Sequence, residues 1–156
     1  MAKVNGSTLF LRLTVLSFAA IIAGLCVFVL PAGILSDTTG MYKWILLGLY
    51  VPALPFFYAI SHTMKLLQYI DKNTAFSDAS VVALQAIKRS AISIAALFSA
   101  GMPYIFYVAN KDDAPGPIAV TLVIIGASVV ITVFAAVLQR LLQSAIAIKA
   151  ENDLTV

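Results

Sequence analysis

Four apolar segments constrain the fold of this chain more than any other feature. Each is roughly 20 to 23 residues long, and an α-helix needs about 20 residues to cross the ~30 Å hydrocarbon core of a bilayer. We expect the membrane spans at about residues 13–35, 43–62, 90–109 and 118–139. Hydrophobic residues make up 62 % of the chain and charged residues 11 %, whereas soluble proteins average ~45–50 % and ~25 %. Residues 1–156 are therefore predicted to form a single all-α domain, an integral membrane four-helix bundle.

The helical pattern continues past the second, third and fourth apolar segments on one side of the membrane. A helix over residues 43–70 would be about 42 Å long at ~1.5 Å per residue, which exceeds the hydrocarbon thickness. The sequence thus predicts three helices that extend beyond the bilayer at this end. It also predicts an elbow over residues 62–90 and a free tail over residues 149–156. Disorder is the alternative for the tail.

The lysines and arginines set the expected orientation. Eight of the ten fall on the side of the elbow and the two termini, namely Lys3, Arg12, Lys65, Lys72, Lys88, Arg89, Arg140 and Lys149. Lys43 and Lys111 fall on the other side. Short cytoplasmic loops of membrane proteins carry an excess of such residues. Both termini and the elbow are therefore predicted to be cytoplasmic.

The third helix has the clearest predicted start. Ser77 is expected to be its N-cap, with the hydroxyl accepting from amides of the first turn. Asp78 follows at the positive end of the helix dipole. Phe76 and Val81 occupy the two positions of a hydrophobic staple.

The sequence contains little that could carry catalysis. His62 is the lone histidine, so one chain cannot supply two histidines to a haem or a metal. A helix-end position with no special task is the favoured interpretation of His62, and proton sensing is the alternative. No nucleophile elbow, phosphate loop or zinc-helix motif is present. We expect no enzyme activity, no cofactor and no metal, and the absence of charges within the spans argues against cation transport.

Prolines and aromatic residues gather at similar depths in the second and third spans. Proline removes a backbone donor inside a helix, and the freed carbonyls with tyrosine hydroxyls could line a crevice that opens to the outer side. The residues of this predicted crevice are Tyr50, Pro52, Pro55, Pro103, Tyr104 and Tyr107. The alternative is that these side chains only fill the space between helices.

Two stretches resemble a known family. The first is Asn73-Thr74-Ala75-Phe76-Ser77 with the apolar stripe Val81, Leu84 and Ile87, and the second is the ending Lys149-Ala150-Glu151-Asn152-Asp153-Leu154-Thr155-Val156. In this order they resemble the small bacterial membrane proteins called domain of unknown function 2975. The resemblance covers the second span to the C-terminus. It implies a four-span protein of the bacterial cytoplasmic (inner) membrane, and its genes often lie beside one for a small helix-turn-helix regulator.

These observations lead to one main functional hypothesis and two alternatives. The main hypothesis is a non-enzymatic membrane sensor or tether that binds a cytosolic partner, with the helix-turn-helix regulator as the partner that the resemblance implies. The predicted partner surface comprises Phe76, Ser77, Lys88, Arg89, Glu151, Asp153 and Leu154. The alternatives are an immunity or small-molecule export component that uses the crevice, and an accessory subunit of a larger membrane complex. Direct nucleic-acid binding is not expected, because the basic residues sit at the ends of apolar segments.

Overall fold

The computed structural model describes residues 6–155, and all regular elements in this range are helical. Their order along the chain is α1 (Gly6–Gly24), the π-helix η1 (Leu25–Val29), α2 (Leu30–Ser36), α3 (Lys43–Gly48), α4 (Tyr50–Asp71), α5 (Asp78–Lys111) and α6 (Gly116–Leu154). The first three elements form one continuous rod, and α3 with α4 forms a second. Four rods result, each long and apolar enough to cross a membrane, as predicted.

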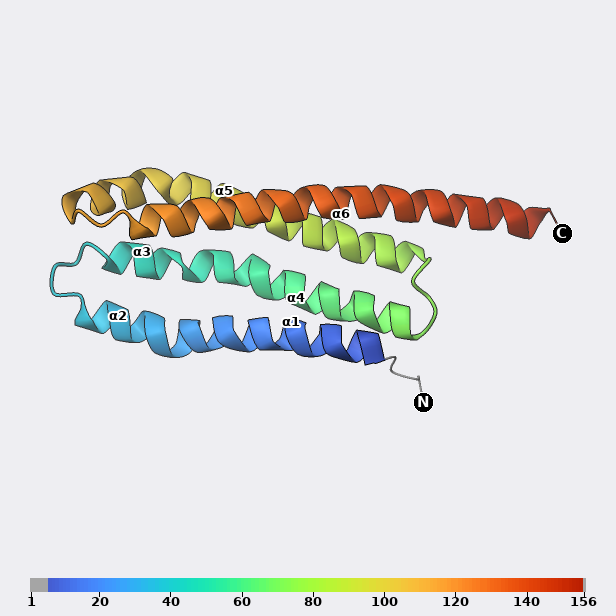
Figure 1. Ribbon diagram of the computed structural model, residues 1–156, viewed down its shortest axis with the longest axis horizontal. Coiled ribbons are helices and arrows are strands. Elements are labelled where there is room, and N and C mark those ends of the chain that lie inside the picture. Colours follow the sequence, from blue (N-terminus) through green and yellow to red (C-terminus); the bar gives the residue numbers. More distant parts are fainter. Residues whose placement is uncertain (1–5, 156) are drawn as a thin grey trace.

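The rods alternate in direction, so that the connections fall at two opposite ends of the molecule. The N-terminal side of α1, the α4–α5 loop and the C-terminal side of α6 lie at one end (Figure 1). The α2–α3 and α5–α6 loops lie at the other end. Seven of the eight basic residues counted above therefore belong to the end that carries the α4–α5 loop, and Lys3 lies outside the described residues.

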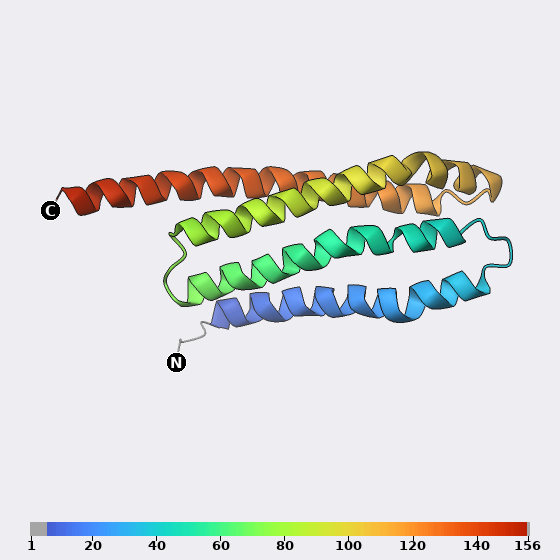
Figure 2. The same ribbon diagram turned by 180° about the vertical axis from the view of Figure 1, so that it is seen from behind.

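The rods are arranged as an open row. The extensive contacts are those of α1 with α4, of α4 with α5, and of α5 with α6 (Figure 2). The four helices are present, but their expected packing as a bundle around one centre is not confirmed, because α1 and α6 lie at the two edges of the row. Lipid solvates apolar side chains as well as a protein core does, so nothing forces the row to close around a shared centre.

The tightest packing lies between α5 and α6, where small side chains face inward. Thr121, Ser128 and Ala135 are buried on α6, whereas Val123 and Phe134 are exposed. Small residues let two helices approach closely in a membrane. Thr121 satisfies its hydroxyl by donating to the Pro117 carbonyl at 2.8 Å. The large apolar side chains of α6 are therefore turned to lipid, the reverse of a soluble protein.

Prolines explain both interruptions of the first two rods. Pro31 cannot donate to the carbonyl one turn before it, and the helix widens just ahead, where the Leu30 amide donates to the Leu25 carbonyl. Pro52 likewise cannot donate to Gly48, and the second rod is interrupted at Leu49 between α3 and α4. Pro55 and Pro103 lie inside α4 and α5, which continue through them.

Two local predictions need correction. The first helix is longer than the predicted span, since it begins by Gly6. The last helix continues to Leu154, so residues 149–154 are neither free nor disordered but are the last turns of α6. Ser77 is the N-cap of α5 but makes no side-chain cap. Its hydroxyl donates instead to the Thr74 carbonyl at 2.7 Å, because the preceding loop offers an acceptor.

Candidate functional site

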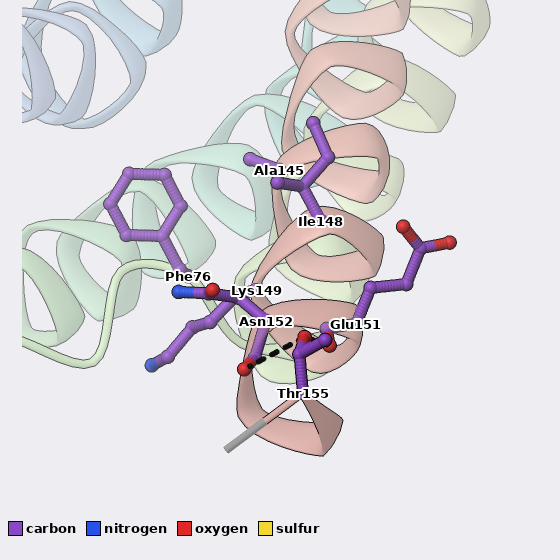
Figure 3. A pocket seen from close by; sticks show the side chains of 7 residues that line it. All are labelled: Phe76, Ala145, Ile148, Lys149, Glu151, Asn152 and Thr155. Atoms are coloured by element: carbon purple, nitrogen blue, oxygen red, sulfur yellow. Dashed lines mark hydrogen bonds between the residues drawn. The ribbon is translucent and has the colours of Figure 1, made fainter.

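The end of the molecule that carries both termini contains an open hollow of about 680 Å³. Phe76, from the α4–α5 loop, lies on one side of it, and the last turns of α6 form the other (Figure 3). The residues from α6 are Ala145, Ile148, Lys149, Glu151, Asn152 and Thr155. The floor is apolar and the rim carries one positive and one negative side chain. This composition suits a protein surface better than it suits a small metabolite.

The hollow unites only part of the predicted partner surface. Phe76 and Glu151 line it, and Asp153 and Leu154 lie on the same exposed end of α6. Ser77 adjoins Phe76 but uses its hydroxyl within the loop. Arg89 is exposed on α5, more than three turns after Ser77.

Lys88 has a structural partner that the sequence did not reveal. Its ammonium group donates to the Gln139 side-chain carbonyl at 3.0 Å, in a partly buried position. Gln139 lies twelve residues before Glu151, about 18 Å along α6 at ~1.5 Å per residue. Lys88 therefore joins α5 to α6 well before the exposed end of α6.

A buried ion pair joins the first rod to the second at this same end. Arg12 Nη2 lies 2.7 Å from Asp71 Oδ2, and the Asp71 side chain is only 3 % exposed. Among residues 6–155, Arg12 Nε and Asp71 Oδ1 have no hydrogen-bond partner. The prediction treated Arg12 only as an orienting charge. Arg12 and Asp71 lie 59 positions apart in the sequence, so local spacing could not predict that they pair. The one acidic residue at the end of a span could have indicated a buried partner.

The predicted crevice at the opposite end is divided by the structure. Pro52 and Tyr104 line one pocket between α3–α4 and α5. Tyr50 lines a separate hollow toward the first rod, where its hydroxyl donates to the Cys26 carbonyl at 2.8 Å. Pro55, Pro103 and Tyr107 line neither pocket. Of the predicted crevice residues, only Pro52 and Tyr104 share a pocket, and Tyr50 faces the first rod.

Hydrogen bonds tie the loops together beside this pocket. The Tyr42 hydroxyl donates to Asp112 Oδ2 at 2.6 Å and so joins the α2–α3 loop to the α5–α6 loop. This hydrogen bond to a carboxylate raises the pKa of Tyr42 above its ordinary value. Tyr104 donates to the Met41 carbonyl at 3.0 Å. These hydrogen bonds hold together the loops that border the pocket.

Within residues 6–155, no three His, Cys, Asp or Glu side chains come together as a metal site would require. The His62 ring is tilted at 48° against the Tyr58 ring with centroids 4.3 Å apart, and its Nδ1 lies 3.0 Å from the Tyr58 carbonyl. Both contacts lie within one turn of α4.

Comparison with known proteins identifies the family. Residues 30–156 match the model of a family described as "Protein of unknown function (DUF2975)". The chain belongs to this family. The DUF2975 chain is also 47 % identical over 156 residues to the uncharacterized membrane protein YoaS of Bacillus subtilis (strain 168), covering 96 % of this chain and 98 % of YoaS. No solved structure matches it.

These matches confirm the resemblance and the location. The DUF2975 match begins at Leu30, near the end of the first rod, as expected from a resemblance that covers the second span onward. A relative that is a membrane protein, together with four helices able to span a bilayer, fits a protein of the bacterial cytoplasmic membrane. The matches assign no activity to DUF2975 proteins.

Proposed function

We propose that this protein is a non-enzymatic membrane sensor or tether that holds a cytosolic protein at the exposed end of α6. The observation that carries the proposal is the length of this helix. It has 39 residues, or about 58 Å at ~1.5 Å per residue. A bilayer with its headgroups is only ~40–45 Å thick. In both views α6 runs past the α4–α5 loop (Figures 1 and 2).

The projecting part of α6 carries apolar side chains that a bilayer at the level of the other rods would not cover. Ile148 is 67 % exposed and Leu154 is 87 % exposed. Phe76 faces the same hollow from the loop and is also exposed. Clustered apolar exposure outside lipid marks protein interaction sites. A cytosolic protein that presents an apolar ridge with a charged border would fit this surface.

A small helix-turn-helix regulator is the first partner to test, because the resemblance implies that a gene for such a regulator often lies beside the genes of this family. In the sensor form of the proposal, a stimulus in the membrane reaches the hollow through α5 and α6. The Lys88–Gln139 hydrogen bond and the close small-residue packing couple these helices. Proline-weakened turns in α4 and α5 supply the freedom to move.

The experiment uses the full chain in native membranes. Ile148→Asp places a charge on the floor of the hollow, and Ala147→Asp places the same charge on an exposed neighbour that does not line it. We expect the native chain and Ala147→Asp to co-purify with a DNA-binding protein after cross-linking, and Ile148→Asp to lose it. Transcripts under the control of that protein should change only in the Ile148→Asp strain. Recovery of no DNA-binding protein by the native chain, with unchanged transcripts after deletion of residues 141–156, would refute the proposal.

A further inference from the structure

The first rod lies at one edge of the row and buries very little of its surface (Figure 1). Among its residues Gly6–Ser36, only Thr8 and Leu30 are buried, and its main contacts are with the second rod. Lipid solvates apolar side chains as well as a protein does, so the hydrophobic effect does not keep this rod in place. Its position depends on a few specific contacts.

The end of the first rod that lies near the α2–α3 loop is packed firmly on the second rod. A Cβ atom added to Gly33 would lie 3.0 Å from Leu46 Cδ1, so α2 approaches α3 closely. Leu30 is only 2 % exposed. The Tyr50 hydroxyl donates to the Cys26 carbonyl at 2.8 Å. From η1 to the loop, the first rod is therefore anchored.

The first rod is weakened where this anchored part joins α1. Leu25–Val29 form the π-helix, which ends where the Leu30 amide donates to the Leu25 carbonyl, and Pro31 has no amide to donate. Sharp changes of direction in helices concentrate at π-turns and at prolines. An open hollow of about 360 Å³ lies between Cys26 and the side of α4 that carries Phe57. The packing beside the π-helix therefore leaves room for a change in helix direction.

At the opposite end, α1 is tied to α4 by a single ion pair. Arg12 Nη2 lies 2.7 Å from Asp71 Oδ2, and this is the one salt bridge among residues 6–155. Asp71 is 3 % exposed, and within the same residues its Oδ1 has no hydrogen-bond partner. A buried charge that loses its counter-charge is strongly disfavoured. Loss of the pair therefore favours a structure in which Asp71 reaches water.

We propose that α1 is a hinged helix, which turns about η1 and Pro31 and is held closed against α4 by the Arg12–Asp71 ion pair. Arg12 precedes Leu25 by thirteen residues, which is about 20 Å at ~1.5 Å per residue. A change of about 20° at the hinge, the size of an ordinary kink, moves Arg12 by about 7 Å. This displacement breaks the ion pair while the anchored end stays in place.

The extent of the family match agrees with a division of the chain at this hinge. The DUF2975 match begins at Leu30, directly after η1, so it covers α2 and the other three rods but not α1. In the open form, the Asp71 carboxylate and the face of α4 beneath α1 become accessible. The proposal does not depend on the cytosolic partner, because α6 lies at the other edge of the row.

Distances between pairs of spin labels measure the position of α1 in the full chain. In a Cys26→Ala chain, Phe10→Cys with Gln68→Cys forms a first pair near the ion pair, and Leu35→Cys with Leu47→Cys forms a second pair near the α2–α3 loop. All four positions are exposed. Double electron–electron resonance in phospholipid vesicles should give one narrow distance distribution for each pair.

Asp71→Asn should lengthen the mean distance of the first pair by about 7 Å and leave the second pair unchanged. Lys72→Gln is the matched control, because it removes an exposed charge beside Asp71, and it should leave both pairs as they are. Arg12→Met combined with Asp71→Leu should lengthen the first pair as well, since lipid solvates apolar side chains equally well. Arg12→Gln replaces Asp71→Asn if that variant does not fold.

Three results would overturn the proposal. A folded Asp71→Asn chain with the native distance in the first pair would show that the ion pair does not hold α1. Lengthening of both pairs together would show that the rod leaves as a whole and has no hinge at η1. A native distance in the combined Arg12→Met and Asp71→Leu chain would show that packing, rather than charge, keeps α1 closed.

Discussion

The Arg12–Asp71 ion pair joins the first rod to the second. The first rod contacts the rest of the row mainly through α4, and it buries few side chains. Taking two charges out of water is costly, and their attraction compensates only while both are present. The pair therefore matters more for where α1 lies against α4 than for the total stability of the fold.

We expect Asp71→Asn to destabilise the protein by about 3 kcal/mol, because it leaves the Arg12 guanidinium partly buried without a counter-charge. The combined change Arg12→Met and Asp71→Leu should recover most of that loss, since an apolar pair avoids the desolvation cost. Unfolding of the detergent-solubilised protein by SDS measures both. Equal stability of Asp71→Asn and the native chain would contradict a paired, buried carboxylate.

Asp37 gives the α2–α3 loop a dependence on pH. The Thr39 hydroxyl, and then the amides of Lys43, Thr39 and Gly40, donate to its carboxylate and lower the pKa of Asp37 below its ordinary value of 3.8. A lowered pKa in the folded state means that the carboxylate stabilises the loop above pH 3.8, and that this contribution disappears as the pH falls through the lower folded value.

We therefore expect the amides of Gly40 and Lys43 to lose hydrogen-exchange protection as the pH falls below about 4, after correction for intrinsic rates. Asp37→Asn should show the weaker protection at every pH, with no change in this range. Gly40 lies at φ 71°, a conformation that the Asp37 hydrogen bonds hold in place. A native loop whose protection is constant from pH 3 to pH 6 would count against this role.

At the scale of elements, the π-helix η1 has a specific partner in the second rod. The Cys26 carbonyl lies in this wider turn and accepts a hydrogen bond from the Tyr50 hydroxyl of α4 at 2.8 Å. This contact and the Arg12–Asp71 pair are about fourteen residues apart on the first rod, so they fix it near both ends.

Tyr50→Phe removes only that hydroxyl. We expect a loss of about 0.6–1.7 kcal/mol, the usual value of a hydrogen bond between membrane helices, measured by the same SDS unfolding. Tyr58→Phe is the matched control, because Tyr58 is exposed on the same helix and its hydroxyl makes no bond within the part of the chain that the structure describes. A larger loss in Tyr58→Phe than in Tyr50→Phe would show that η1 is held by something else.

At the scale of the whole molecule, the row of rods separates a basic end with the projecting α6 from an end with two short, braced loops. The proposed function requires that the end with the projecting α6 face the cytoplasm, as the distribution of lysines and arginines predicts.

Cysteine labelling measures this orientation. In a Cys26→Ala chain, Thr38→Cys and Ala79→Cys place one thiol in the α2–α3 loop and one at the start of α5, both at exposed positions. A membrane-impermeant maleimide should label Thr38→Cys on intact cells and should label Ala79→Cys only after permeabilisation. The reverse pattern would place the hollow outside the cytoplasm and would remove the basis of the proposed function.

The candidate sites were predictable in part. The exposed end of α6 and the aromatic residues near Pro52 follow from the spacing of apolar residues and prolines along single helices. Their division into separate pockets does not, because it depends on how each rod is rotated about its axis. Tyr50 and Pro52 are adjacent in depth, yet one faces the first rod and the other faces α5.

The sequence by itself predicted four helices that are long and apolar enough to cross a membrane, and the family that the chain resembles. It could do so because a bilayer has a fixed thickness and leaves no backbone group unpaired, so that length and hydropathy decide the helices locally. Only the tertiary structure decided that the rods form an open row and that Arg12 meets Asp71, Tyr42 meets Asp112 and Lys88 meets Gln139. Those partners lie 51 to 70 positions apart, and their meeting depends on the order and rotation of neighbouring rods, which no single segment encodes.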